Sequence, residues 1–185
     1  MRIIEKKLNG LILFEPIVFG DSRGYFLESY KQSKFNEDTG TEIAFVQDNE
    51  SLSSRDVLRG LHFQAPPFAQ GKLVRVCTGS VLDVAVDIRV ESPTFGQHFK
   101  TVLSEENKRQ LWIPPGFAHG FLTLADETRF IYKCTNYYNK ASESGIRWND
   151  EDLRINWEVE NPIISEKDLE LPKLNMLKSP FRYVQ

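Results

Sequence analysis

The chain has 185 residues, a length typical of one domain with one hydrophobic core, and a net charge of −3 from 23 basic and 26 acidic residues. Because the basic residues are spread along the chain, the sequence predicts no surface for a nucleic acid. The segment from Met1 to Lys7 has no apolar signal-peptide core, and no stretch of about 18 apolar residues could span a bilayer. We therefore expect a cytoplasmic protein with no membrane partner.

Aromatic residues make up 12% of the chain, including 13 Phe, and favour a β-rich fold in which rigid side chains fill the interior or line a pocket. Two cysteines, Cys77 and Cys134, lie in strand-like runs. For a cytoplasmic β protein we interpret them as free thiols and not as a disulfide.

The first elements are short. Apolar runs over residues 8–18 predict a hairpin or two edge strands. A turn at Arg23 precedes a predicted strand over 25–30, in which Phe26 and Glu28 share one face. This combination of cation, aromatic ring and carboxylate could bind an anionic planar ligand, although a solvated turn and an ordinary half-buried strand explain the spacing equally well.

The next region alternates between connection and strand. We expect a short helix over 32–37, a strand over 43–49 and a loop over 51–56. The strand ends in three polar residues, from Gln47 to Asn49. Because buried polar groups need hydrogen-bond partners, this end of the strand is expected to face a polar ligand.

An apolar stretch over residues 57–64 contains both an arginine and a histidine. Strict alternation would place Arg59 and His62 on opposite faces of a strand. Gly60 lies between them and predicts a β-bulge. With that bulge, the two side chains can approach the same ligand.

Two clear strands follow over 72–77 and 81–89, and a tight hairpin is predicted at residues 78–80. The second strand has one apolar face, while Asp83 and Asp87 lie on the opposite face. A polar cavity and bulk solvent both explain that acidic face, and the pattern does not decide between them.

The remaining strands are predicted over 99–103, 110–113, 120–124 and 129–135. In total we expect nine to eleven short strands, which is typical of a jelly roll with two sheets. The expected single domain spans residues 1–185, with a core over about 10–140 and a C-terminal segment over 141–185. That segment should contain short helices, one beginning at Ser165, and a tail packed loosely or across a partner subunit.

Candidate chemistry follows from residue types. The chain has three histidines and no His-x-His pair, so a metal-dependent jelly roll is poorly supported. Motifs for acyl or phosphoryl transfer are also missing from the sequence. A histidine with a pKa near 6.5 can take a proton, a tyrosine can deliver one, and Lys or Arg can hold an oxyanion. Together they suit proton abstraction beside a carbonyl through an enolate, although each residue alone is more often structural.

Several motifs in register resemble one enzyme family over about residues 10–170. They are Gly20-Asp21-x-Arg23-Gly24-x-Phe26-x-Glu28, Gln47-Asp48-Asn49-x-Ser51, the run from Val57 to Gln64, the run from Gln70 to Val76, the run from Asp83 to Arg89, and the run from Pro114 to Phe121. This set closely resembles the dTDP-4-dehydrorhamnose 3,5-epimerase family.

The resemblance implies a cupin-like, all-β jelly roll that acts as a homodimer without metal or cofactor. Its substrate would be dTDP-4-dehydro-6-deoxy-D-glucose, inverted at C3 and C5 to dTDP-4-dehydro-L-rhamnose. By the same resemblance, His62 is the base and Asp168 orients it. Lys72 and Arg59 hold the enolate oxygen, and Tyr132 protonates the opposite face.

The resemblance also assigns the supporting residues. Asp83 and His119 would form a second pair in the pocket. Contacts to the diphosphate, thymine and sugar, some of them across the dimer, would come from Arg23, Phe26, Glu28, Gln47, Asn49 and Tyr138.

Three other functions are compatible with parts of this pattern. A relative that inverts only C3 or only C5 would share His62 and Lys72. A non-catalytic nucleotide-sugar binding protein would need neither His62 nor Tyr132. A metal-dependent oxygenase cupin would lose its activity on chelation.

Overall fold

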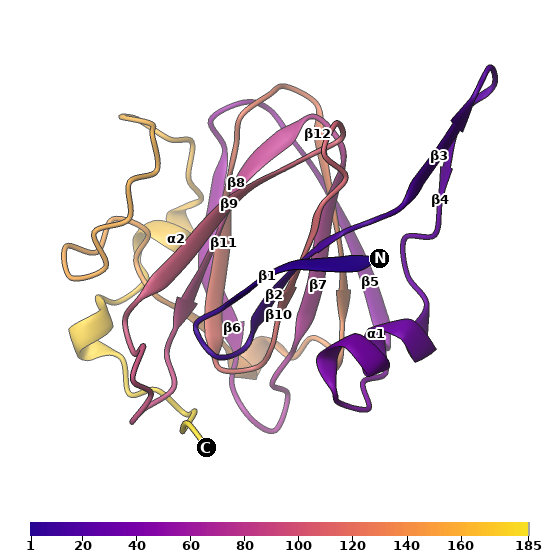
Figure 1. Cartoon of the computed structure of the whole chain (residues 1–185). Coiled ribbons are helices and arrows are strands. Elements are labelled where there is room, and N and C mark those ends of the chain that lie inside the picture. The colour runs from indigo at the N-terminus through magenta and orange to yellow at the C-terminus, as the bar shows by residue number, and fades with distance from the viewer. Residues whose placement is uncertain (185) are drawn as a thin grey trace.

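The computed structural model describes residues 1–184, which form two antiparallel β-sheets packed face to face and a projecting β-ribbon (Figure 1). The six-stranded sheet has the order β1-β2-β10-β7-β12-β5, and the five-stranded sheet has the order β13-β6-β11-β8-β9. Strands that are distant in sequence lie side by side in each sheet, as in a jelly roll. The all-β prediction is therefore confirmed.

The strands of the six-stranded sheet are β1 (Arg2–Lys7), β2 (Leu11–Glu15), β5 (Gln47–Ser53), β7 (Lys72–Thr78), β10 (Gln110–Ile113) and β12 (Thr128–Cys134). Those of the five-stranded sheet are β6 (Leu58–Gln64), β8 (Ser80–Asp87), β9 (His98–Ser104), β11 (Phe117–Thr123) and β13 (Glu143–Gly145). The ribbon pairs β3 (Val18–Asp21) with β4 (Gly24–Leu27). The helices are α1 (Gln32–Thr39), α2 (Glu166–Leu169) and the 3₁₀ turns η1 (Lys140–Ser142) and η2 (Leu174–Met176).

Each sheet has a buried inner face and an outer face that is at least partly covered. Between them lies a cluster of buried apolar side chains that includes Val74, Phe121 and Phe130. Helix α1 covers the outer face of the six-stranded sheet through Phe35, which contacts Trp112 edge to face with ring centroids 5.2 Å apart. The C-terminal segment covers the other outer face, where Leu82, Val84 and Val86 meet Leu153, Trp157 and Leu177. The expectation of a loosely packed tail was therefore wrong.

The predicted hairpin at residues 78–80 is also wrong. Strands β7 and β8 do not pair with one another, because the chain leaves one sheet at Thr78 and enters the other at Ser80. Gly79 allows this corner, since its φ is +76° and a Cβ there would lie 2.4 Å from the Thr128 hydroxyl oxygen. A glycine turn signal is the same for a hairpin and for a corner between two sheets.

Several strand boundaries differ from the predictions. Strand β5 begins at Gln47 and continues through Ser53, where a loop was expected, and β4 ends at Leu27 instead of reaching residue 30. The inner face of β5 carries polar side chains, so apolar alternation does not mark it. Thirteen strands occur in residues 1–184, against nine to eleven expected, because β1 and the short β13 were not predicted.

Other local predictions hold. The helix expected over 32–37 is present as α1, and the helix expected from Ser165 is present as α2, with the Ser165 hydroxyl accepting from the Asp168 amide. Both cysteines are free. None of the helices in the described part of the chain is long and apolar enough to cross a membrane.

Candidate active site

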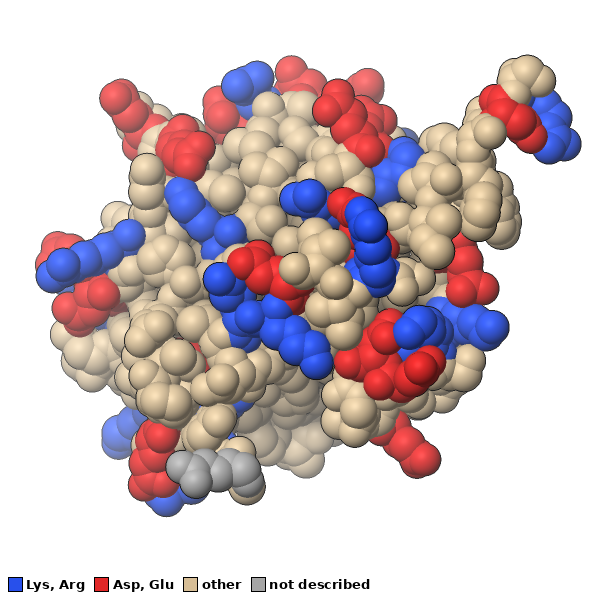
Figure 2. Space-filling model, in the orientation of Figure 1, with Lys and Arg blue, Asp and Glu red and all other residues tan. Residues whose placement is uncertain are grey.

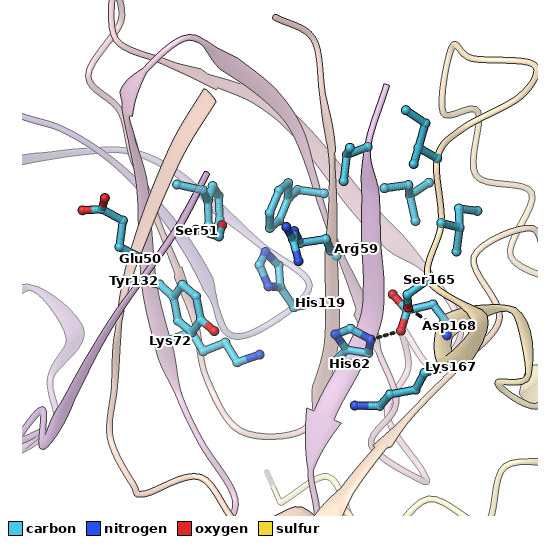
Figure 3. Close-up of a pocket in the computed structure, with 17 residues that line it drawn as sticks. Glu50, Ser51, Arg59, His62, Lys72, His119, Tyr132, Ser165, Lys167 and Asp168 are labelled. Carbon is cyan, nitrogen blue, oxygen red and sulfur yellow. Dashed lines mark hydrogen bonds and ion pairs between the residues drawn. The ribbon is translucent and has the colours of Figure 1, made fainter. Parts of the chain in front are cut away.

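A cavity of about 580 Å³ lies between the two sheets, near the end where β5 and β6 are found. Strands β5, β7 and β12 supply one wall, β6 and β11 supply the facing wall, and the segment around α2 closes one side. Figure 3 shows polar side chains from both walls and from the α2 segment around this space, with the Glu50 carboxylate directed away from it. They are Glu50, Ser51, Arg59, His62, Lys72, His119, Tyr132, Ser165, Lys167 and Asp168.

His62 and Asp168 form a hydrogen-bonded pair on one wall. The distance from His62 Nε2 to Asp168 Oδ1 is 2.7 Å, and the second carboxylate oxygen accepts from the Gly60 amide at 3.1 Å. Burial opposes ionisation of Asp168, but the hydrogen bonds from His62 and Gly60 outweigh it, so the pKa of Asp168 lies below its usual value. The carboxylate therefore stays charged and fixes the imidazole, leaving Nδ1 for a ligand.

A β-bulge at Gly60 brings Arg59 and His62 to one site. Arg59 pairs with Phe121 and His62 pairs with His119, with a shift of register between the two pairs. A Cβ at Gly60, where φ is +130°, would lie 2.5 Å from the Gly120 Cα, so this close crossing of β6 and β11 requires glycine. The predicted bulge is confirmed, and Arg59 and His62 both line the cavity.

Tyr132 and Lys72 lie on the facing wall, on the adjacent strands β12 and β7. The Lys72 ammonium lies 5.7 Å from the centroid of the Tyr132 ring. Burial raises the pKa of Tyr132 and lowers the pKa of Lys72. The phenol therefore remains protonated at neutral pH and can act as a donor, with its hydroxyl directed into the cavity opposite His62 (Figure 3).

His119 lines the cavity with Asp83 behind it. The His119 Nε2 atom lies 2.9 and 3.1 Å from the two carboxylate oxygens of Asp83, which is fully buried and does not line the cavity. The ring of His119 stacks against Phe130, with centroids 6.0 Å apart. Asp83 can therefore reach a ligand only through His119.

The acidic face of β8 is buried, which rules out bulk solvent as its explanation. The alternative explanation, a polar cavity, applies to Asp83 alone, and Asp83 reaches the cavity only through its hydrogen bond with His119. Asp87 is held away from the cavity by Arg89, Ser92 and Thr94.

Arg59 extends from β6 across the gap between the sheets. Its guanidinium donates to the Ser53 hydroxyl at 3.2 and 3.1 Å. Because Ser53 is the last residue of β5, this contact ties together the two sheet edges that border the cavity. A cation is thereby held at the cavity wall.

Gln47, Asn49 and Tyr138 gather beside the cavity. The Gln47 amide donates to Asn49 at 3.0 Å and accepts from the Tyr138 backbone amide at 3.0 Å. Asn49 is the pairing partner of Tyr132 on β12. The Tyr138 side chain is 51% exposed and offers a flat surface on which a base could stack.

Arg23, Phe26 and Glu28 are not brought to this cavity within one chain. Arg23 and Phe26 lie on the ribbon, which projects away from the body of the protein, and Glu28 follows it (Figure 1). Phe26 is 68% exposed, and Phe19 and Tyr25 are also exposed. Figure 2 shows oppositely charged side chains at the tip of the ribbon and uncharged surface along its length.

Several residues at the site were not predicted. Glu143 accepts from the Tyr138 hydroxyl at 2.9 Å and pairs with Lys167 at 2.5 Å, which links the Tyr138 segment to helix α2. Ser51 lines the cavity from β5. The sequence offered a signal for Ser51, which ends a family motif, and for Lys167, which precedes Asp168. It offered none for Glu143, whose role depends on tertiary contacts.

Metal ligands are not clustered in this site. Across residues 1–184, no group of three or more His, Cys, Asp or Glu side chains is placed to hold a metal ion. The polar groups of the cavity instead include two carboxylate-bound histidines, a phenol and three basic side chains, which suit proton transfer.

Comparison with known proteins places this geometry in a family. A family model described as dTDP-4-dehydrorhamnose 3,5-epimerase matches residues 5–176. A Shigella flexneri protein of that name is 55% identical over 169 residues, covering 91% of this chain and 93% of the relative. The crystal structure of a Legionella pneumophila dTDP-6-deoxy-D-glucose-3,5-epimerase in complex with dTDP-4-keto-L-rhamnose has a TM-score of 0.95 and 46% identity, covering 100% of this chain and 99% of that chain. A Bacillus anthracis dTDP-4-dehydrorhamnose 3,5-epimerase structure with TDP and pyrophosphate bound has a TM-score of 0.90 and 48% identity, covering 93% and 98%.

Proposed function

The chain belongs to the dTDP-4-dehydrorhamnose 3,5-epimerase family, and from this we propose how its residues carry out the reaction. The activity is the epimerisation of dTDP-4-dehydro-6-deoxy-D-glucose at C3 and C5 to dTDP-4-dehydro-L-rhamnose, a step of dTDP-L-rhamnose biosynthesis. One observation carries the residue assignment. A carboxylate-bound histidine and a protonated tyrosine lie on facing walls of one cavity.

His62 is the base. Both C3 and C5 are adjacent to the C4 ketone, so removal of either proton gives an enolate instead of an isolated carbanion. Asp168 holds the imidazole by Nε2 and stabilises the imidazolium that forms after proton transfer. The Gly60 amide fixes the other oxygen of Asp168, so the base is oriented before substrate binds.

Lys72 and Arg59 hold the enolate oxygen. Negative charge develops on the C4 oxygen when the proton leaves, and cations already placed at the cavity wall stabilise that charge. The support for these roles is that the Lys72 ammonium is buried near Tyr132 and that Arg59 is anchored to Ser53. His119, backed by Asp83, borders the same space as a further polar contact.

Tyr132 is the acid. Inversion requires the new proton to arrive on the face opposite to the one that lost it. Tyr132 comes from the sheet that faces His62, and its raised pKa keeps it in the donor form. The resulting phenolate takes a proton from solvent and the His62 imidazolium releases one, so both groups return to their starting forms and the cycle is redox-neutral without a cofactor.

The nucleotide lies outside the sugar cavity, at Gln47, Asn49 and Tyr138. We assign the remaining contacts, Arg23, Phe26 and Glu28, to the ribbon of a second copy in a homodimer. The support is that the ribbon exposes large apolar side chains and points away from its own cavity. The free thiols of Cys77 and Cys134 and the nucleotide-sugar substrate favour a cytoplasmic location.

Exchange with heavy water tests the function. Purified protein and substrate are incubated in D₂O, and label at each carbon is followed by NMR. Deuterium is expected at both C3 and C5 of the product, whereas label at one carbon only would show a single-position epimerase. The variant His62→Asn should lower turnover by at least about 10²-fold while dTDP binding is kept. Unchanged turnover in this variant would remove His62 from the mechanism, and the absence of any turnover by the unmodified protein would leave only a binding function.

A further inference from the structure

The inner face of strand β5 presents a row of polar side chains to the space between the sheets. Asn49 pairs with Tyr132, Ser51 pairs with Phe130, and Ser53 pairs with Thr128 on the neighbouring strand β12. Side chains of directly paired residues lie on the same face of a sheet, and those two residues apart lie about 7 Å from one another along the strand. Ser51 is therefore midway between Asn49 and Ser53.

The neighbours of Ser51 in this row already have hydrogen-bond partners. Asn49 accepts from Gln47 at 3.0 Å, and Ser53 accepts from Arg59. The Ser51 hydroxyl oxygen is buried and has no partner among residues 1–184. Two other buried polar atoms in this range share that property, but they belong to Asp38 and Arg109, which do not line the cavity.

A buried hydroxyl without a partner needs a physical explanation, because alanine would fill the same space without the unfavourable desolvation. Ser51 is the strand partner of Phe130 in the cavity wall that also carries Tyr132. A hydrogen-bonding group of the bound sugar would satisfy it there. We propose that Ser51 is a specificity-determining residue that hydrogen-bonds the C2 hydroxyl of the bound 4-keto-6-deoxyhexose.

The choice of C2 rests on the proposed function and on the chemistry of its substrate. A 4-keto-6-deoxyhexose joined to a nucleotide through C1 has free hydroxyls only at C2 and C3. The C3 oxygen changes position when C3 inverts, so a side chain fixed on a strand cannot hold it in both substrate and product. The C2 hydroxyl keeps its configuration throughout. It can therefore anchor the ring while the two neighbouring positions change.

The location of Ser51 agrees with this choice. Going along β5 from Gln47 toward Ser53, the row begins beside the Tyr138 backbone, where we place the nucleotide, and ends at Arg59, which we assign to the C4 oxygen. A sugar whose nucleotide stays at the Gln47 end follows the same order, from C1 through C2 to C4. Ser51 occupies the middle of that path.

The test combines the variant Ser51→Ala with a substrate that lacks the C2 hydroxyl. On the full substrate, kcat/KM should fall about 3- to 10-fold, the range expected for one neutral hydrogen bond. On the 2-deoxy analogue, the variant and the unmodified protein should agree within about twofold, because the hydrogen bond is missing in both. The exposed Ser54→Ala is the matched control and should leave kcat/KM on both substrates unchanged.

Three outcomes would overturn the inference. They are an undiminished kcat/KM for Ser51→Ala on the full substrate, an equal fall on both substrates, and a loss of deuterium exchange confined to C3, which would assign Ser51 to the C3 hydroxyl. The unfolding temperature of Ser51→Ala should be equal to or above that of the unmodified protein, because no partner is lost and a buried unpaired hydroxyl is removed, and its dTDP affinity should be unchanged. Failure of the proposed function is distinguishable, since the unmodified protein would then incorporate no deuterium.

Discussion

Replacing Tyr132 by phenylalanine separates proton removal from inversion. The substitution deletes one hydroxyl and keeps the ring that packs beside Phe130 at a centroid distance of 6.0 Å. In residues 1–184 the Tyr132 hydroxyl makes no hydrogen bond, so its removal leaves no buried group without a partner. We expect the free energy of unfolding to change by no more than about 0.5 kcal/mol.

Catalysis should change far more than stability. A general acid contributes about 10²- to 10⁴-fold, so formation of inverted product should fall by at least about 10²-fold. His62, Asp168 and Lys72 are unchanged in this variant and still form the enolate. His62 can then only return a proton to the face from which it removed one. The expected signature is substrate that gains deuterium without inversion.

The assay follows substrate and product by NMR in D₂O, with unfolding measured on the same preparation. Tyr132→Phe should exchange deuterium into unreacted substrate faster than it forms product. Product formation within about threefold of the unmodified rate, at normal stability, would refute the role of Tyr132 as the acid. Loss of exchange together with inversion would assign Tyr132 to enolate formation instead.

Further predictions concern the other groups of the site. Lys72→Met should lower kcat/KM by about 10²- to 10³-fold with dTDP affinity retained, as for loss of one oxyanion donor; a smaller loss than tenfold would contradict this role. Asp168→Asn should lower both kcat and stability, the latter by about 1–3 kcal/mol at neutral pH. The pKa of Asp168 is lower in the folded protein than in the unfolded chain. Its contribution to the free energy of unfolding is therefore present above the unfolded pKa of about 3.9 and is lost as the pH falls through the folded pKa. Denaturation curves of Asp168→Asn and the unmodified protein should converge in acid. Mixing inactive Arg23→Ala and His62→Ala subunits should restore about a quarter of full activity. Random pairing makes half of the dimers mixed, and each mixed dimer has one complete site out of two. No recovery after subunit exchange would show that the ribbon does not serve the partner's site.

The sequence predicted the fold wherever apolar alternation marks a strand. Strands β6 and β10 are nearly as expected, and the Gly60 bulge followed from the need to place Arg59 and His62 together. Strand β5 was cut short because its inner face is polar. The turn at Gly79 was misread because a corner between sheets uses the same residues as a hairpin.

Some residues of the candidate site could be predicted from the sequence and others could not. The pairing of His62 with Asp168, 106 residues apart, came from family resemblance, since no spacing rule links positions so distant. Glu143 could not be found from the sequence, because its importance arises from contacts with Tyr138 and Lys167 on two other segments. The exposed ribbon has the same limitation. Its charged and aromatic pattern is visible in the sequence, but its projection away from the cavity of its own chain is not.

The polar inner face of β5 explains why a cavity exists in this sandwich at all. Facing sheets lie about 10 Å apart, a spacing that interdigitated apolar side chains normally fill. They fill it around Val74 and Ala85. Toward β5 and β6 the inner residues are short and polar, or are charged, and they cannot form a dry core without partners. A sugar ring placed there meets one sheet on each face, so the architecture itself places His62 and Tyr132 on opposite sides of the ring. Inversion through an enolate is the chemistry that uses both.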